Sequence, residues 1–285
     1  MHPMVAAFLD SATSSYSYVV AEPGSRTCAV IDPVLDFDPA TGITSTTGAD
    51  RIIDFVRAND LIVEWLLETH VHADHLSAGH YLKSHFVCAQ TGIGRGVIEV
   101  QETFADSVPR CPDSPLVPDG HQFDRLLDAG EKLCLGHACG RVLALPGHTP
   151  ACVGYQFDDF ILVGDTLFMP DYGTARCDFP GGDSATLYRS IQQLFAEPDE
   201  TKLLMCHDYA PGGRSHRYLS TVAEQRAHNI HIRDGVSEAE FVAFRNTRDG
   251  TLSAPALMTV AVPYNLTAGQ LDTADLSLLH KRMAA

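Results

Sequence analysis

Short apolar runs recur along the whole chain, and segments with helical spacing of apolar residues lie between them. The runs are enriched in β-branched residues, which is typical of buried or half-buried strands. They predict strands at 18–20, 28–31, 61–67, 141–145, 160–163 and 202–205.

Apolar residues at helical spacing predict four helices. These begin near residue 49 and after residue 183, and cover 215–230 and 237–244. Ser237 and Glu240 have the spacing of a capping box at the start of the last helix. Strands and helices that alternate in this way favour an α/β or α+β architecture in which helices cover the faces of a sheet.

Two segments are expected to be loops. Residues 33–50 are rich in Pro, Asp, Thr and Gly, and residues 106–121 contain four prolines. No internal repeat or sharp change of composition divides the chain. We therefore predict one domain over residues 1–285, with a core at about 5–230 and a C-terminal extension at 231–285.

The charge balance is acidic and limits the partners of the protein. The 285 residues include 20 Lys and Arg against 36 Asp and Glu, a formal net charge of −16. Such a surface repels phosphate backbones and anionic lipids, so neither a nucleic acid nor a membrane surface is expected as a partner. No apolar run approaches the roughly 18 residues that span a bilayer, and the first residues do not resemble a signal peptide. We expect a cytoplasmic protein.

The eight cysteines form no Cys-x-x-Cys pair, and Cys134 and Cys139 do not suggest a zinc ribbon. In a reducing cytosol most of the eight should be free thiols. Buried cysteine packs as a small hydrophobic residue, and we expect this of Cys177 and Cys206.

The strongest chemical signal is the segment 69–75, Thr-His-Val-His-Ala-Asp-His, which follows the apolar run at 61–67. His70, His72, Asp74 and His75 place four potential metal ligands within six positions. If the strand continued, His70 and His72 would point the same way. Imidazole and carboxylate together suit zinc, iron or manganese.

Three later segments place a similar side chain after an apolar run. His148 lies in Pro-Gly-His-Thr, Asp165 in Gly-Asp-Thr, and His207 in Cys-His-Asp-Tyr. Loops at the carboxyl ends of strands are where α/β proteins commonly bind ligands. Each segment alone would pass for an ordinary turn, but together with the first motif they indicate one metal site.

These four segments, in this order, resemble the metallo-β-lactamase superfamily. The resemblance implies an α+β fold, a four-layer αββα sandwich of two mixed β-sheets flanked by helices, with metal bound at the sheet edge. Further segments resemble the persulfide dioxygenases of that superfamily, including a bacterial branch described as β-lactamase-like hydrolases. They are Arg-Cys-Asp-Phe at 176–179, His-Asp-Tyr at 207–209, Ala-Val-Pro-Tyr-Asn at 261–265 and the segment 32–38.

This resemblance implies that His70, His148 and Asp165 hold one Fe(II) per chain as a facial triad. The other four potential ligands would orient the triad or bind a second metal, a choice that the sequence leaves open: His72, Asp74, His75 and His207. The implied reaction oxidises glutathione persulfide with O₂ and water to sulfite and glutathione, in sulfide detoxification.

Arg176 and Tyr209 are the residues that the resemblance suggests for binding glutathione. Without the resemblance, an ion pair between Arg176 and Asp178 would be the expected arrangement. The alternative function is a dinuclear thioesterase similar to glyoxalase II, which would bind two Zn, Fe or Mn ions and cleave hydroxyacylglutathione. Members of the resembled family often form homodimers, so the resemblance also suggests a homodimer, although no segment of the sequence specifies a self-complementary surface. The remaining histidines are expected on the polar surface: His80, His85, His121, His137, His216, His228 and His231.

Overall fold

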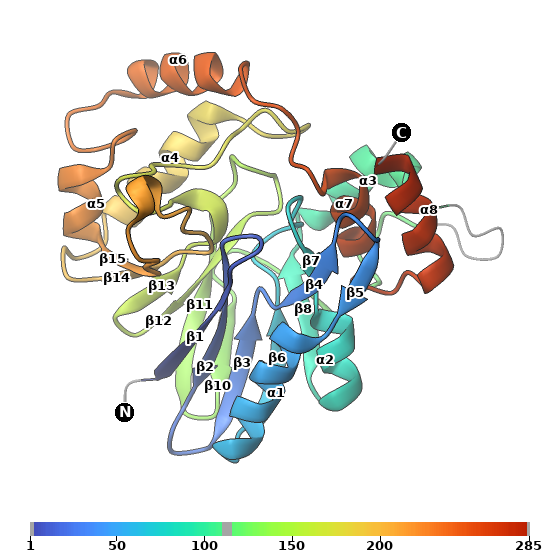
Figure 1. The fold of residues 1–285 in the computed structure, drawn as a ribbon. Helices are drawn as coiled ribbons and strands as arrows, with labels where there is room; N and C mark the ends of the chain where they lie inside the picture. Colours follow the sequence, from blue (N-terminus) through green and yellow to red (C-terminus); the bar gives the residue numbers. More distant parts are fainter. Residues whose placement is uncertain (1–2, 110–115, 284–285) are drawn as a thin grey trace.

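The computed structural model describes residues 3–109 and 116–283. Within these residues, two mixed β-sheets lie face to face (Figure 1). The first sheet has the order β1-β2-β3-β6-β8-β9. Its strands are β1 (Met4–Asp10), β2 (Ser15–Ala21), β3 (Thr27–Ile31), β6 (Ile62–Leu67), β8 (Gln90–Gly94) and β9 (Arg125–Leu127). The strands β3, β6, β8 and β9 are parallel, and β1 and β2 complete the sheet as an antiparallel hairpin.

The second sheet has the order β10-β11-β12-β13-β14-β15. Its strands are β10 (Lys132–Leu135), β11 (Ala138–Ala144), β12 (Val153–Phe157), β13 (Phe160–Leu162), β14 (Lys202–Leu204) and β15 (Leu219–Thr221). Only β13 and β14 pair in parallel. Because β12 is antiparallel to both β11 and β13, the strands β11, β13 and β14 all run in one direction.

Alternate residues of the central strands pack on opposite faces, and this alternation builds the layers. In β3, Ala29 and Ile31 join Tyr155 and Leu162 of the second sheet in the core between the sheets. Val30, on the other face of β3, packs against the helices. The expected four-layer αββα arrangement is confirmed, because each sheet has one face on the other sheet and one face under helices.

Different helices cover the two outer faces. The first sheet is covered by α1 (Thr47–Ala58), α2 (Gly79–His85), α7 (Met258–Leu266) and α8 (Thr273–Met283). The second sheet is covered by α4 (Ser184–Phe195), α5 (Val222–His228) and α6 (Glu238–Asp249). A smaller cluster joins α3 (Val97–Phe104) to α7. Among the described residues, no helix is both long and apolar enough to cross a membrane.

Two of the expected segments differ in the structure. Residues 33–50, expected to be a loop, contain β4 (Val34–Asp38), β5 (Ile43–Ser45) and the start of α1. β4 pairs with both β5 and the distant β7 (Leu76–Ser77), a pairing that local composition does not reveal. The helix expected at 215–230 is shorter, because 219–221 form β15. In the segment 106–121, residues 110–115 lie outside the described residues.

Most of the described cysteines are free thiols, as expected, but two are not. Cys134 and Cys139 lie opposite each other on β10 and β11, with their Cα atoms 4.0 Å apart, and form a disulfide. The register of the β10–β11 hairpin brings the two residues together. Their spacing in the sequence does not reveal this register. The other described cysteines are free thiols, and all but the exposed Cys88 are buried: Cys28, Cys88, Cys152, Cys177 and Cys206.

Candidate metal centre

The potential ligands gather where strand ends of the two sheets meet. The loops that follow β11, β13 and β14 carry His148, Asp165 and His207, and these strands share one direction. The segment 70–75 follows β6 of the first sheet. β6 ends at Leu67, so His70 and His72 lie in the loop and not on the continuation of a strand. An isolated bridge between Ser15 and His207 joins the two sheets beside the site.

His70, His148 and Asp165 form one compact group. The Oδ2 atom of Asp165 lies 3.8 Å from His70 Nε2 and 3.7 Å from His148 Nε2. All three side chains are buried, and one ligand atom from each lies within 4.8 Å of the others. Two imidazoles and one carboxylate in this arrangement form a site that can hold a metal ion.

The imidazoles of the site are oriented by contacts at the nitrogen that faces away from it. His148 Nδ1 donates a hydrogen bond to the main-chain oxygen of Arg176 at 2.7 Å. This contact fixes the tautomer and leaves Nε2 as the metal-facing nitrogen. The Nδ1 atoms of three other histidines have comparable partners: His70 with Thr69 Oγ1, His75 with the main-chain oxygen of Leu76, and His207 with Ser15 Oγ.

Several polar atoms directed into the site make no hydrogen bond to any described residue. They are His70 Nε2, His72 Nδ1, Asp74 Oδ2, His75 Nε2, Asp165 Oδ1 and His207 Nε2. Buried polar atoms nearly always have a partner, and leaving one without a partner costs about 1–3 kcal/mol. A cation bound by the triad would satisfy His70 Nε2, and most of the remaining atoms belong to the neighbouring potential ligands, so the residues fit the metal that the sequence motifs suggest.

A buried Asp32 supports His72 from behind. Its carboxylate accepts hydrogen bonds from Thr69 N at 2.7 Å and Thr69 Oγ1 at 2.9 Å, and lies 3.1 Å from His72 Nε2. Glu68 Oε2 lies 3.4 Å from the same nitrogen. Burial alone would lower the pKa of His72, but Asp32 and Glu68 outweigh it and raise this pKa well above its usual value.

In the sequence, Asp32 stands out only as the first residue of the segment 32–38, which resembles a segment of the persulfide dioxygenases. Its position directly after β3, beside the parallel strand β6, is the signal that could have identified it.

Asn265 of α7 holds the loop that carries His72 and His75. Its amide nitrogen donates to the main-chain oxygens of both histidines at 2.8 Å, and its Oδ1 accepts from Ser77 N at 2.8 Å. Asn265 is buried. The Ala-Val-Pro-Tyr-Asn segment thus supports the metal centre because its asparagine side chain holds the backbone of the ligand loop. It supplies no metal ligand of its own.

Two glycines allow the loops of the second sheet to approach the site. Gly164 has φ +53°, and a Cβ there would lie 2.8 Å from Thr69 Oγ1. Gly147 has φ +138°, and a Cβ there would lie 2.4 Å from the backbone of Leu187. A larger residue at either position would displace Asp165 or His148, which follow directly in the chain.

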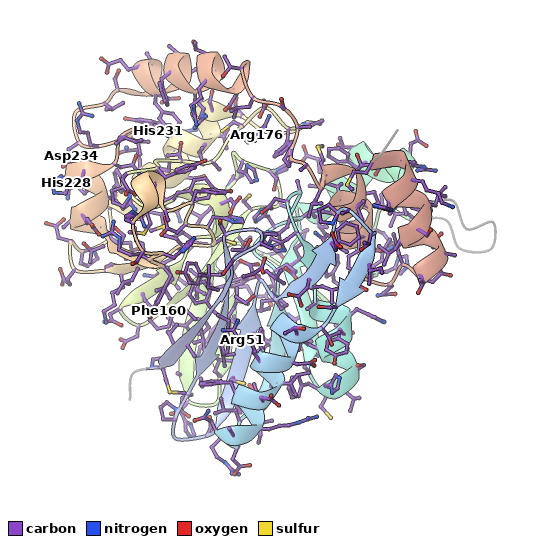
Figure 2. All side chains as sticks on the ribbon, in the orientation of Figure 1. Arg51, Phe160, Arg176, His228, His231 and Asp234 are labelled. Atoms are coloured by element: carbon purple, nitrogen blue, oxygen red, sulfur yellow. A yellow bond between two sulfur atoms is a disulfide. The ribbon has the colours of Figure 1, made fainter. Side chains whose placement is uncertain are left out.

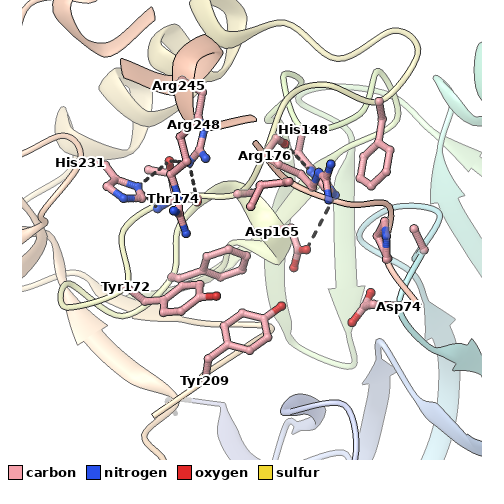
Figure 3. A pocket seen from close by; sticks show the side chains of 16 residues that line it. Asp74, His148, Asp165, Tyr172, Thr174, Arg176, Tyr209, His231, Arg245 and Arg248 are labelled. Atoms are coloured by element: carbon pink, nitrogen blue, oxygen red, sulfur yellow. Dashed lines mark hydrogen bonds and ion pairs between the residues drawn. The ribbon is translucent and has the colours of Figure 1, made fainter. Parts of the chain in front are cut away.

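A cavity of about 270 Å³ opens beside the triad (Figure 3). Asp74, His148 and Asp165 lie at one end, and the rings of Tyr172 and Tyr209 form part of the wall, 4.5 Å apart between centroids. The hydroxyl groups of both tyrosines point toward the side of the cavity where Asp165 lies. Tyr209, expected from the sequence to contact substrate, therefore lines the cavity that reaches the metal centre.

Arg176 also lines this cavity, but its guanidinium is engaged. Nε and Nη2 each donate to a carboxylate oxygen of Asp178 at 2.6 Å, and Nη1 donates to the main-chain oxygen of Ser253 at 2.7 Å. The ion pair with Asp178 is the arrangement expected without the family resemblance. The proposed contact of Arg176 with glutathione stays a prediction.

Three further cationic or titratable residues line the cavity, and the sequence did not indicate them: His231, Arg245 and Arg248. His231 was expected on the polar surface, but it lies against Thr174, whose main-chain N–H donates to Nδ1 at 3.0 Å. Burial, followed by Arg245 and Arg248, lowers the pKa of His231 to about 4. Figure 2 shows Arg176 and His231 beneath α6, whereas Phe160 lies away from them at the start of β13.

Arg245 and Arg248 of α6 differ in how they are engaged. Arg245 is buried and donates from Nε and Nη2 to Asp249 Oδ1, at 3.0 and 2.7 Å. Arg248 is exposed and makes no ion pair or side-chain hydrogen bond with the described residues. Arg248 is therefore the cation of the cavity that is available to an anionic ligand.

Comparison with known proteins identifies the family of this fold. The model of the Metallo-beta-lactamase superfamily matches residues 11–207. A probable metallo-hydrolase of Burkholderia pseudomallei is 51% identical over 277 residues, covering 94% of this chain and 93% of that protein. Glyoxylase B2 of Dictyostelium discoideum is 44% identical, covering 92% and 89%.

Two more distant relatives carry a more specific name. The human mitochondrial persulfide dioxygenase ETHE1 is 27% identical over 259 residues, covering 90% of this chain and 84% of that protein. The crystal structure of ETHE1 from Myxococcus xanthus superposes with a TM-score of 0.74 at 28% identity, covering 94% of this chain and all of that chain. This chain therefore shares its fold with the ETHE1 protein of Myxococcus xanthus.

Proposed function

Because this chain belongs to the metallo-beta-lactamase superfamily, we propose that it is a glutathione-dependent persulfide dioxygenase with one Fe(II) bound by His70, His148 and Asp165. The reaction is GSSH + O₂ + H₂O → GSH + SO₃²⁻ + 2H⁺. The outer sulfur of the persulfide is oxidised, O₂ is reduced, the S–S bond breaks, and glutathione leaves with a proton.

The observation that carries this proposal is the separate, compact His-His-Asp group beside a cavity with an available arginine. The group has the ligand types of a facial triad, in which three protein ligands leave open coordination positions. The similarity to proteins named ETHE1 supports the same reaction. Bound ferrous iron would supply the activation of O₂ and of the persulfide sulfur.

The residues of the chain have distinct roles in this proposal. Arg176, through its main-chain oxygen, holds His148 with Nε2 toward the metal. Phe168 and Phe179 line the cavity beside the triad and exclude water from the reacting sulfur. Tyr172 and Tyr209 donate hydrogen bonds to the bound thiol compound. Arg248 binds a glutathione carboxylate at the outer end of the cavity.

A second candidate function is a dinuclear thioesterase similar to glyoxalase II. It is favoured by the metal-facing atoms of His72, Asp74, His75 and His207, which lie beyond the triad and make no hydrogen bond to the described residues. A relative named Glyoxylase B2 is consistent with it. In that function a metal-activated water would attack the thioester carbonyl.

The deciding experiment measures oxygen uptake by anaerobically iron-loaded protein supplied with fresh glutathione persulfide, with sulfite assayed in the same vessel. We expect one O₂ consumed per sulfite formed. His148→Ala and Asp165→Ala should abolish both signals, because each removes one of three ligands. His137→Ala, which changes an exposed histidine on the turn between β10 and β11, should keep the wild-type rate.

Hydrolysis of lactoylglutathione by the same preparations distinguishes the two functions. Protein that holds one iron per chain but consumes no O₂ in the presence of persulfide, and that hydrolyses the thioester once a second metal ion is bound, would replace the dioxygenase proposal with the thioesterase.

A further inference from the structure

The imidazole of His148 is held by a peptide group that a buried carboxylate holds from the other side. His148 Nδ1 donates a hydrogen bond to the main-chain oxygen of Arg176 at 2.7 Å. The N–H of the same peptide group belongs to Cys177 and donates to Asp249 Oδ2 at 2.8 Å. A trans peptide group is planar, and its N–H and C=O point in opposite directions. The contact that fixes the N–H therefore also fixes the direction of the oxygen that His148 contacts.

Asp249 is the last residue of α6, and Arg245, one turn earlier, holds its carboxylate. Arg245 Nε and Nη2 donate to Asp249 Oδ1 at 3.0 and 2.7 Å. Arg245 Nη1 donates to the main-chain oxygen of Thr174 at 3.1 Å, and Figure 3 shows Arg245 reaching Thr174. The two charged side chains are 1% and 4% exposed. The buried pair thus contacts the segment 174–177 at both of its ends.

Stability alone does not account for this ion pair. Both charges lose their hydration on burial, and replacing such a pair with apolar residues of similar volume is often neutral or stabilising. Apolar side chains, however, neither accept a hydrogen bond from Cys177 N nor donate one to Thr174. The placement of the segment 174–177 is therefore the property that Arg245 and Asp249 determine.

We propose that Asp249 is a positioning residue for the metal site and orients His148 through the peptide group of Arg176 and Cys177. A negative charge at the N–H end polarises this peptide group and strengthens the hydrogen bond that its oxygen accepts. The proton of His148 is thereby kept on Nδ1, and Nε2 faces the metal position, as when a carboxylate contacts a ligand histidine directly. The inference deepens the proposed function, because it rests on His148 as a metal ligand.

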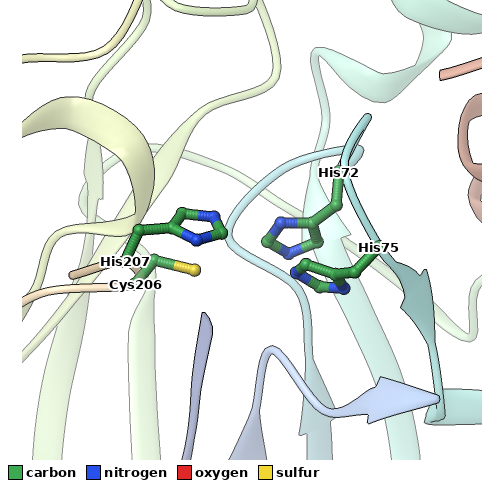
Figure 4. Close-up of side chains that lie close together, drawn as sticks. All are labelled: His72, His75, Cys206 and His207. Carbon is green, nitrogen blue, oxygen red and sulfur yellow. The ribbon is translucent and has the colours of Figure 1, made fainter. Parts of the chain in front are cut away.

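The other imidazoles at the centre are held by contacts outside α6. Figure 4 shows three of these rings, those of His72, His75 and His207. The contacts that hold them are His72 with Asp32, His75 with the main-chain oxygen of Leu76, and His207 with Ser15 Oγ. None of these contacts involves the segment 174–177. A change at Asp249 should therefore disturb His148 and leave the three rings of Figure 4 as internal controls.

NMR of metal-free, full-length protein labelled with ¹⁵N-histidine tests the orientation directly. At about pH 8.5, where an ordinary imidazole is neutral, the ¹⁵N shifts show which ring nitrogen carries the proton. His148→Ala identifies the His148 signals by their loss. We expect the proton on Nδ1 in the wild-type protein and partly on Nε2 in Asp249→Asn, because an amide has one acceptor oxygen for two donors. The tautomers of the three histidines in Figure 4 should not change.

A second variant separates the orienting role from stability. Asp249→Asn leaves the buried Arg245 without its anionic partner and should lower stability, whereas Arg245→Met combined with Asp249→Leu removes both charges. The double variant should unfold at a denaturant concentration close to that of the wild-type protein. It should nevertheless show the same change in the His148 tautomer. Asp234→Asn is the matched control, because Asp234 pairs with Arg226 at the surface and neither residue lines the cavity.

Anaerobic titration with Fe(II) against a competing chelator gives a readout that does not depend on turnover. Both Asp249 variants should bind Fe(II) about 10-fold more weakly than Asp234→Asn, the lower end of the cost of losing a contact behind a ligand. The proposal is overturned if the His148 tautomer or the Fe(II) affinity of the folded variants matches that of Asp234→Asn. Variants that show both changes, in a protein that consumes no O₂ with glutathione persulfide, would contradict the dioxygenase and leave the role of Asp249 standing.

Discussion

In each imidazole at the candidate metal centre, one nitrogen faces the metal position and the other contacts the protein. For His72 the protein-facing contact is the Asp32 carboxylate, which also binds two groups of Thr69. Thr69 Oγ1 in turn lies 3.0 Å from His70 Nδ1. One buried carboxylate thus orients His72 directly and His70, a residue of the proposed triad, through Thr69.

We predict that Asp32→Asn lowers the affinity for metal about 10–100-fold, the usual cost of losing a contact behind a ligand. An amide cannot serve both Thr69 and His72 as the carboxylate does, so one buried partner is left unsatisfied. The free energy of unfolding of the metal-free protein should therefore fall by about 1–3 kcal/mol. Metal titrations and urea unfolding measure the two effects.

Asp54→Asn is the control for this change, because Asp54 lies exposed on α1 and the same charge is removed. It should leave metal affinity unchanged. If Asp32→Asn bound metal as tightly as Asp54→Asn, Asp32 would have no orienting role.

At the level of elements, local signals predicted some structures well and others not at all. The capping box at Ser237 forms as predicted and starts α6, and the apolar face of α1 packs on the first sheet. β4 was missed because its partner β7 lies far along the chain, so a polar segment becomes a strand only through tertiary pairing. Strand identity depends on such partners more than helix identity does.

The contact of α7 with the metal-binding loop is another long-range feature. We predict that Asn265→Ala lowers the free energy of unfolding by at least about 2 kcal/mol, because it leaves Ser77 N and the main-chain oxygens of His72 and His75 without their buried partner. Denaturant unfolding of metal-free protein measures this. Binding of a second metal should weaken more than binding of iron by the triad, since both affected histidines lie outside the triad.

Asn59→Ala provides the matched control, because Asn59 is exposed at the end of α1 and its amide makes one solvent-exposed hydrogen bond, to the main-chain oxygen of Phe55. It should cost less than about 0.5 kcal/mol. Equal stability of the two variants would show that the α7 contact does not hold the loop.

For the whole molecule, the motifs predicted the centre of the site but not its surroundings. His70, His148 and Asp165 each follow a recognisable apolar run, and the fold brings these runs to one edge. His231 and Arg248 lie on later segments with no local signature, and only the packing of α6 on the second sheet places them at the cavity. We propose that residues 231–285 fold with the core as one domain, since α6, α7 and α8 pack in the same clusters as the sheets.

The net charge of −16 opposes the binding of an anionic glutathione compound, so local cations at the cavity must offset it. Arg176 and Arg245 are paired with Asp178 and Asp249, which leaves Arg248 to attract the ligand. We predict that Arg248→Gln raises the KM for glutathione persulfide by up to about 5-fold, the range of an exposed ion pair, with kcat unchanged. Steady-state oxygen uptake measures both constants.

Arg189→Gln removes the same charge from α4, where Arg189 is exposed and pairs with Glu238 away from the cavity. If long-range charge alone governed binding, the two variants would raise KM equally, and added salt would remove the difference from wild type in both. A larger KM for Arg248→Gln at every salt concentration indicates direct contact with the substrate. A larger effect of Arg176→Gln on KM would instead return the glutathione contact to Arg176, and would require its pair with Asp178 to open when substrate binds.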